Sequence, residues 1–361
     1  MTDKNLIFLI SLPRSGSTLT QKILGAHSAI YTRSEPWIML NPLYSLKQEG
    51  IDAVYNKQLE YVATQDFITN LSGGREKYIK YLSNAYISMY GDYLMDNNKN
   101  MFLDKTPRYY LIINELKEVF PTAKYILLIR NPLAVLSSII NIWTKDNLSS
   151  LLNFKIDLID GLDTIINQVL DKQNDLYILR YETLLSSPTE TLKKCFKYLN
   201  LEFDPDVTNY HTENINKKWL YGDPENIYRK KGIDSSNDLK WVNSLNDWQH
   251  WRLINDYLNY IGKDRFEILG YNFNDFSKLL LEKLPSSSIE DLEDNTISLF
   301  EFLESAEEKK EKLLESTQHE LKSLEEENKH LRKSIVEIET GKIYILAKML
   351  AKPYKWIKKI V

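Results

Sequence analysis

A short apolar segment and the hydroxyl-rich loop after it, over residues 6–19, constrain the fold more than any other part of this chain. Residues 6–10 are all apolar and too few for a helix, which predicts a strand covered on both faces. Pro13 and Gly16 interrupt the segment, and a helix can begin at Ser17. Free N–H groups at the start of such a helix, together with its dipole, favour a bound anion. The sequence therefore predicts an α/β fold with a phosphate-binding loop.

The residues of the loop indicate the kind of phosphate. A loop that binds a nucleoside triphosphate reads Gly-Lys-Ser/Thr, and here Gly16 and Thr18 fit while Ser17 replaces the lysine. The guanidinium of Arg14 and the neighbouring hydroxyl groups instead suit a single phosphate group. The expected binding residues are Arg14, Ser15, Gly16, Ser17 and Thr18. An ordinary turn between a strand and a helix is the alternative.

A second buried strand is predicted from Lys124, and it ends at Arg130. Asn131 is a preferred N-cap and Pro132 a preferred first residue of a helix. Arg130 and Ser138, two helical turns later, can converge on one anion at the strand ends, where open α/β sheets bind their ligands. Together the two motifs predict a ligand with two separated phosphate groups.

The two motifs resemble those of a known family. Residues 13–19 resemble the 5′-phosphosulfate loop of PAPS-dependent sulfotransferases, and Arg130 with Ser138 resembles their 3′-phosphate motif. PAPS is 3′-phosphoadenosine 5′-phosphosulfate. Further segments similar to bacterial members, related to the tyrosylprotein and carbohydrate sulfotransferases, follow in the same order at residues 104–108, 120–121, 181–185 and 198–203. The resemblance covers residues 5–275. It implies a P-loop-like parallel sheet flanked by helices, and transfer of a sulfuryl group from PAPS to a hydroxyl group.

This chemistry requires a base and a cation near the oxygen that leaves. Glu35 is the expected base, because its separation from Arg14 is similar to that of the acidic base in tyrosylprotein sulfotransferases. In the alternative, Glu35 pairs with Arg33 or Arg14 and only shapes the pocket. Asp104 is the second candidate base. Arg14 and Lys105 are the expected cations, so no metal is needed.

The resemblance also implies further contacts with the nucleotide. Tyr181, after a strand predicted over residues 175–180, is expected beside the adenine or its phosphate; in the alternative it closes the core. Arg229, Lys231 and Lys240 are expected to form a basic lid over the 3′-phosphate, as the family has basic residues in comparable positions. The alternative is that these charges are solvated.

Composition excludes several classes of protein. The 361 residues are 43% hydrophobic and 12% aromatic, which is ample for a core. A net charge of −4 gives no reason to expect nucleic acid. Cys195 is the single cysteine, fits a reducing compartment, and is expected to be an inert core thiol. Neither a secretory signal nor an apolar run of about 18 residues is found, so we expect a cytoplasmic protein.

The domain organisation changes after the region of resemblance. We expect a sulfotransferase domain over residues 1–276, a linker over 277–298, a coiled coil over 299–340 and a basic amphipathic tail over 341–361. In the heptads, positions 314, 321, 328 and 335 are a, and positions 317, 324, 331 and 338 are d. Asn328 at an a position favours a two-stranded parallel coiled coil, hence a homodimer; a single helix folded on the enzyme is the alternative. The tail has six lysines and no acidic residue, which is typical of contact with the inner membrane face.

The acceptor is predicted only in outline. Residues 37–93 are expected to form a helical insertion over the site, where the family usually builds acceptor specificity. The tail favours a glycan or glycolipid. A tyrosine acceptor is the alternative, although Trp37 stands where an acceptor-site arginine is expected. A nucleotide or sugar kinase and a non-catalytic scaffold are the rivals from other classes.

Overall fold

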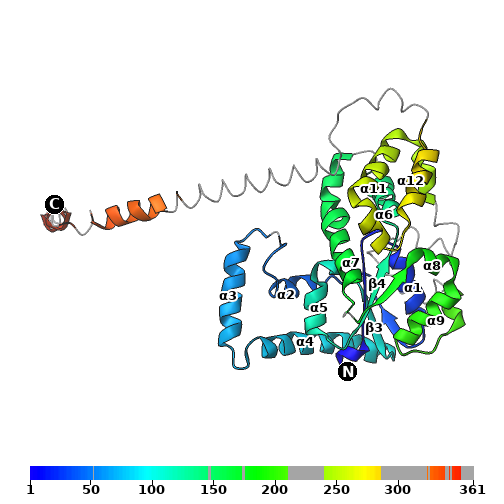
Figure 1. Cartoon of the computed structure of the whole chain (residues 1–361). Helices are drawn as coiled ribbons and strands as arrows, with labels where there is room; N and C mark the ends of the chain where they lie inside the picture. Colours follow the sequence, from blue (N-terminus) through cyan, green and yellow to red (C-terminus); the bar gives the residue numbers. More distant parts are fainter. Residues whose placement is uncertain are drawn as a thin grey trace, which may run out of the picture. The chain divides into compact units, whose positions relative to one another are not determined.

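The computed structural model describes residues 1–51, 53–144, 148–172, 175–209, 240–285, 323, 326–337, 341 and 344–350. The chain divides into two units, Met1–Asn295 and Thr296–Val361. The first unit is built on a five-stranded sheet with helices on both faces, which confirms the predicted α/β fold (Figure 1).

The sheet is parallel and has the order β2-β3-β1-β4-β5. Its strands are β1 (Leu6–Ser11), β2 (Ile30–Thr32), β3 (Met101–Lys105), β4 (Lys124–Ile129) and β5 (Tyr177–Arg180). All six residues of the central β1 are buried, as the apolar run predicted. Because the strands are parallel, the residues after β1, β2, β3 and β4 lie at one edge of the sheet.

Helices connect the strands. They are α1 (Ser17–Gly25), α2 (Leu40–Tyr44), α3 (Lys57–Asn70), α4 (Gly74–Asn97), α5 (Ile113–Val119), α6 (Pro132–Ile139), α7 (Gly161–Leu170), α8 (Tyr181–Ser186), α9 (Pro188–Tyr198), α11 (Trp248–Ile268) and α12 (Phe273–Glu282). Helices α2 to α4 lie between β2 and β3, as the predicted helical insertion required. Asn131 caps α6 by accepting a hydrogen bond from the Leu133 N–H. Tyr181 follows β5, as predicted, and is the first residue of α8.

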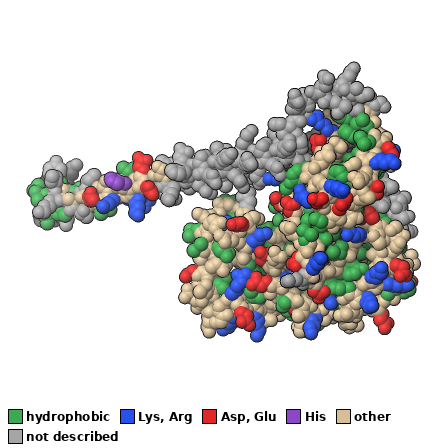
Figure 2. Space-filling view, in the orientation of Figure 1, with side chains coloured by type: hydrophobic (Ala, Val, Ile, Leu, Met, Phe, Trp, Pro, Cys, Tyr) green, Lys and Arg blue, Asp and Glu red, His purple; other side chains and the backbone are tan. Residues whose placement is uncertain are grey.

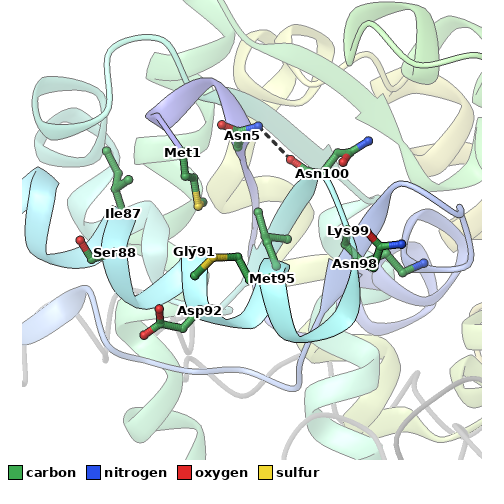
Figure 3. A pocket seen from close by; sticks show the side chains of 11 residues that line it. Met1, Asn5, Ile87, Ser88, Gly91, Asp92, Met95, Asn98, Lys99 and Asn100 are labelled. Carbon is green, nitrogen blue, oxygen red and sulfur yellow. Dashed lines mark hydrogen bonds between the residues drawn. The ribbon is translucent and has the colours of Figure 1, made fainter.

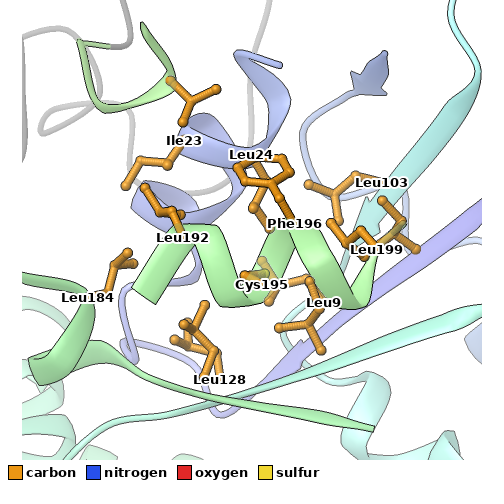
Figure 4. Packing of buried hydrophobic residues seen from close by; sticks show 14 of the residues in the cluster. Leu9, Ile23, Leu24, Leu103, Leu128, Leu184, Leu192, Cys195, Phe196 and Leu199 are labelled. Carbon is orange, nitrogen blue, oxygen red and sulfur yellow. The ribbon is translucent and has the colours of Figure 1, made fainter. Parts of the chain in front are cut away.

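One face of the sheet packs against α1 and α9 (Figure 4). Leu9, Leu103 and Leu128 from three strands contact this layer, which includes Phe196. Cys195 in the same cluster is fully buried, and burial raises the pKa of its thiol to about 12. The expected core thiol is confirmed.

The other face packs against α4 and α5. Phe8 lies 5.5 Å from the rings of both Phe120 and Tyr125, and Tyr90 of α4 lies 4.5 Å from Phe102. Side chains alternate along a strand, so Asp104 shares a face with Phe102, and Lys105 emerges on the opposite one. This alternation decides which polar residue of β3 faces the loop after β1.

Tryptophan side chains pack near the C-terminal end of the first unit. Trp241 and Trp251 are buried, Trp248 stacks on Trp251 at 5.3 Å, and the Trp251 Nε1–H donates to the Leu280 carbonyl at 2.8 Å. These residues therefore pack α11 against α12. Residues 277–282 of the predicted linker belong to α12, with Leu280 buried and its carbonyl bonded to Trp251; the domain boundaries stay a prediction.

The second unit is described in two short helical stretches, residues 326–337 and 344–350. Leu331 and Ile335, at predicted d and a positions, are 58% and 56% exposed. Most of the predicted heptads lie outside the described residues, so the coiled coil stays a prediction. In the described part of the chain no helix is long and apolar enough to cross a membrane.

The surface of the first unit carries both signs of charge. On the face seen in Figure 2, lysine and arginine side chains are interspersed with aspartate and glutamate side chains. A hollow of about 550 Å³ lies beside α4, lined among others by Met1, Asn5, Gly91 and Asn100 (Figure 3). Asn5 and Asn100 precede β1 and β3, so this hollow is at the amino edge of the sheet, opposite the loop after β1.

Candidate functional site

The loop between β1 and α1 has a backbone shape that its residues require. Arg14 and Gly16 have φ angles of 64° and 85°, in the left-handed region. A Cβ atom at Gly16 would lie 2.2 Å from a ring carbon of Tyr181. Glycine is therefore needed for both conformation and space. Tyr181 is buried against the loop and belongs to the core cluster beneath it, as its alternative role in the core required; its expected contact with the adenine or its phosphate stays a prediction.

The predicted 3′-phosphate residues lie next to this loop. Arg130 Nη1 donates to the Arg14 carbonyl at 2.8 Å, and Arg14 Nε donates to Ser138 Oγ at 3.1 Å. The Arg130 guanidinium lies 4.8 Å from the centre of the Tyr181 ring. Three strand ends thus bring together two guanidinium groups, a hydroxyl and an aromatic ring that are far apart in the sequence.

The predicted catalytic residues form a second group on the same loop. Lys105 Nζ lies 2.6 Å from Glu35 Oε1 and 3.4 Å from Thr18 Oγ1. The side chains of Lys105 and Glu35 are only 1% and 10% exposed. A buried ammonium group needs such a partner, since an unpaired buried charge is strongly unfavourable. Glu35 lies three residues after β2 and pairs with Lys105, whereas Arg33 donates to Tyr93 Oη at 2.9 Å.

Asp104 lies on the opposite face of β3 from Lys105. Its carboxyl accepts hydrogen bonds from Tyr90 Oη at 2.6 Å, Tyr109 Oη at 3.1 Å and Thr106 Oγ1 at 3.3 Å. Burial raises the pKa of Asp104 to about 6, although these hydrogen bonds oppose the rise. The structure does not place this second candidate base beside the loop.

Of the three residues of the predicted basic lid, the structure describes only Lys240. Lys240 begins a short 3-10 segment, Lys240–Asn246, and its side chain is exposed. Arg229 and Lys231 lie outside the described residues. The lid therefore stays a prediction.

The contacts of three further residues of the site were not predicted. The Arg14 guanidinium lies 5.4 Å from the centre of the Trp143 ring. Trp37 Nε1 donates to Glu35 Oε2 at 3.3 Å, and both indoles are about two-fifths exposed. Glu182 accepts hydrogen bonds from the Asn131 N–H and the Tyr271 hydroxyl, both at 2.8 Å. Two of these residues had a signal in the sequence: Trp37 stands where an acceptor-site arginine was expected, and Glu182 lies within the 181–185 motif.

The donor set fits a ligand with phosphate groups. Guanidinium and ammonium groups and hydroxyls surround a loop whose helix starts with free N–H groups. Glu35 is the acidic side chain that pairs with Lys105. No group of three or more His, Cys, Asp or Glu residues that could hold a metal ion is found among the described residues. Fold and site together define an α/β protein of the nucleotide-phosphate-binding class.

Comparison with known proteins identifies the family. Residues 6–205 match the Sulfotransferase family, and the chain belongs to it. The nodulation protein NoeE of Sinorhizobium fredii is 26% identical over 74% of this chain and 66% of its own length. Protein-tyrosine sulfotransferase 1 of Danio rerio is 23% identical over 60% of this chain and 58% of its own length. The matched region thus spans less than two thirds of either relative.

The chain is also similar to solved structures of sulfotransferases. The sulfotransferase domain from the olefin synthase of Synechococcus PCC 7002 is 21% identical, with a TM-score of 0.43, over 67% of this chain and 88% of that domain.

Replacement of Asp104 by asparagine has a pH-dependent consequence. The pKa of Asp104 is raised from 3.8 to about 6 in the folded chain. The folded state therefore holds the proton more tightly, and this stabilisation is complete below about pH 4 and is lost as the pH rises through about 6. The change corresponds to about 3 kcal/mol. In urea unfolding, we expect wild type to lose about that much stability relative to Asp104→Asn between pH 4 and 7. A difference that does not vary with pH would contradict this.

Proposed function

We propose that this protein transfers a sulfuryl group from PAPS to a hydroxyl group of a glycan or glycolipid, releasing 3′,5′-adenosine bisphosphate. The observation that carries the proposal is the set of contacts joining Arg14, Arg130 and Ser138 on one side of the loop, and Thr18, Lys105 and Glu35 on the other. This set contains two guanidinium groups, those of Arg14 and Arg130, that can bind phosphate groups. It also contains the carboxylate of Glu35 paired with the ammonium group of Lys105. Both of these residues lie between Arg14 and Arg130 in the sequence and at the same edge of the sheet. Bound PAPS supplies the sulfuryl group and a phosphate leaving group.

The phosphate-binding residues have distinct tasks. The loop residues Arg14, Ser15, Gly16, Ser17 and Thr18 would hold the 5′ end, because their hydroxyls and first-turn N–H groups are hydrogen-bond donors. Arg130 and Ser138 would hold the 3′-phosphate. Arg130 lies against Tyr181, which limits the motion of its guanidinium and leaves its remaining N–H groups for the ligand.

The catalytic residues would move one proton and stabilise one oxygen. Glu35 takes the proton of the acceptor hydroxyl as the acceptor oxygen bonds to sulfur. The bond from sulfur to the 5′-phosphate oxygen breaks, and that oxygen keeps the electron pair. Lys105 and Arg14 stabilise its developing charge. Glu35 Oε1 and Oε2 already accept bonds from Lys105 and Trp37, but a carboxylate offers about four acceptor sites, so it can still receive the acceptor proton.

Two rival functions are less well supported. A kinase would bind a triphosphate, yet Ser17 occupies the position of the lysine that contacts its phosphates. For a tyrosine acceptor, Trp37 replaces the expected arginine with a large half-exposed indole. A ring of this kind suits the apolar face of a sugar.

Two substitutions test the proposed roles. Arg130→Ala should weaken binding of 3′,5′-adenosine bisphosphate about 10- to 100-fold, since it removes a charge-assisted hydrogen bond. Glu35→Gln should leave this Kd within about twofold and lower kcat about 10²- to 10⁴-fold, because it removes the general base. Calorimetry gives the Kd, and transfer of labelled sulfate from PAPS to a glycan acceptor gives kcat.

Arg75→Ala is the matched control, since Arg75 is an arginine of α4 that pairs with Glu118 on the surface. It should change neither quantity. A loss of affinity in Glu35→Gln as large as that in Arg130→Ala would overturn the division of roles.

The second unit would place the enzyme on a membrane as a dimer. Leu331 and Ile335 leave an apolar stripe for pairing with a second copy. In residues 344–350, Ile345, Leu346 and Met349 are exposed, in a tail with six lysines. Apolar insertion and lysine attraction to anionic lipid both favour the membrane surface.

Vesicle flotation tests the role of the tail. The full chain should float with vesicles containing anionic lipid, and a chain ending at Thr340 should stay in the soluble fraction. Vesicles of neutral lipid control for charge and should recover less of the full chain. Equal recovery of the two chains in the soluble fraction would exclude membrane contact through the tail.

A further inference from the structure

A group of buried hydroxyls surrounds Asp104, on the face of β3 turned away from the phosphate-binding loop. Tyr90 comes from α4, Thr106 follows β3, and Tyr109 comes from the 3-10 helix Tyr109–Ile112. Tyr90 and Tyr109 donate to Oδ2 of Asp104, and Thr106 donates to Oδ1. Asp104, Thr106 and Tyr109 are each at most 1% exposed. The proposed mechanism uses none of these groups.

The hydroxyls also bind the segment that carries Glu35. The Trp37 N–H donates to Thr106 Oγ1 at 3.2 Å, and the Met39 N–H donates to Tyr109 Oη at 3.3 Å. These are main-chain contacts two and four residues after Glu35. The connection from β2 to α2 is thereby fastened at two points to the end of β3.

The carboxylate fixes the direction of these bonds. A hydroxyl has one proton and two lone pairs. Because Thr106 and Tyr109 give their protons to Asp104, the lone pairs of both oxygens remain for the N–H groups of Trp37 and Met39. Asp104 thus makes acceptors of two hydroxyls that would otherwise be free to rotate.

The segment needs such fastening, because its backbone is strained. Trp37 has a φ angle of 59°, an unfavourable conformation for a bulky residue. A residue persists in such a conformation only where its surroundings fix it, and these sites are frequently functional. Here the left-handed residue has its indole Nε1–H directed at Glu35 Oε2. The backbone N–H of Trp37 thus binds the hydroxyls around Asp104, and its side chain binds the proposed base.

We propose that Asp104, Thr106 and Tyr109 are positioning residues that hold the Trp37 segment in its left-handed turn and so align Glu35 with Lys105. The inference rests on the proposed role of Glu35 as base. The three residues act from behind the sheet and contact neither the phosphate-binding loop nor Lys105 in the described hydrogen bonds. Their loss should affect turnover more than nucleotide binding.

The neighbouring tyrosines provide a matched pair of variants. Tyr109→Phe removes the hydroxyl that binds Met39 and Asp104. Tyr110→Phe removes an equally buried hydroxyl, which donates to Asp157 at 2.6 Å. Both should lower the melting temperature to a similar extent. Only Tyr109→Phe should lower kcat, by about tenfold, with the Kd for 3′,5′-adenosine bisphosphate unchanged within about twofold. Equal kcat values in the two variants would overturn the proposal.

Thr106 gives an independent test if Tyr109→Phe fails to fold. Thr106→Val keeps the shape and removes the acceptor of the Trp37 N–H, so kcat should again fall about tenfold. Thr106→Ser keeps the hydroxyl and should restore kcat to within about twofold of wild type. Similar kcat values in the valine and serine variants would contradict the proposal.

The Glu35→Gln background separates this inference from the proposed function. If Glu35 is the base and Thr106 acts through it, Thr106→Val should cause no further loss of kcat in Glu35→Gln. An additive further loss would overturn the positioning role alone. Full turnover in Glu35→Gln itself would overturn the role of Glu35 as base, and this inference with it, whereas absence of sulfate transfer by the wild-type protein would overturn the proposed function.

Discussion

The pairing of a buried ammonium group with a carboxylate, Lys105 with Glu35, is the interaction on which the site depends. Lys105 is almost completely buried at the end of β3, where a charge without a partner is strongly unfavourable. Glu35 satisfies it, and the pair lies beside Thr18 of the phosphate-binding loop. The same arrangement brings the proposed base and the proposed cation together before any ligand binds. Preorganised charges of this kind are usually the largest contribution to catalysis.

The parallel sheet brings Glu35 and Lys105 together, because the residues after its strands lie at one edge. β3 and β4 flank β1, so Lys105 and Arg130 emerge on either side of the loop after β1. Arg130 and Arg14 are then joined through a main-chain carbonyl. Tyr181, from the end of β5, closes against Gly16 at a distance that only glycine permits. Each strand thus contributes one residue of the candidate site after its carboxyl end, where open α/β folds generally bind their ligands.

Much of the site was predictable because its residues follow strands that are recognisable in the sequence. The apolar run before Pro13 and the Asn131–Pro132 cap mark two strand ends without reference to the rest of the chain. The cluster of hydroxyl-bearing side chains around Asp104 was not predictable, because it depends on which face of β3 each residue occupies. Asp104 and Lys105 are adjacent in sequence and equally plausible as site residues, yet the pleat sends them to opposite faces. The contact between Trp143 and Arg14 was not predictable for a related reason. It depends on the π-helical segment Ile140–Thr144, which no local sequence pattern predicts. Helix α12 was not predicted, because most of its residues are not buried and only Leu280 is.

Thermal stability in the presence of nucleotides tests the central claim, that this site binds a ligand with separate 5′ and 3′ phosphate groups. The comparison is 3′,5′-adenosine bisphosphate against AMP and Mg-ATP at equal concentration. The account predicts selective stabilisation by the bisphosphate, about 2.7 kcal/mol at a hundred times its Kd, because only this ligand engages both Arg14 and Arg130. No stabilisation by the bisphosphate, or greater stabilisation by Mg-ATP, would contradict it.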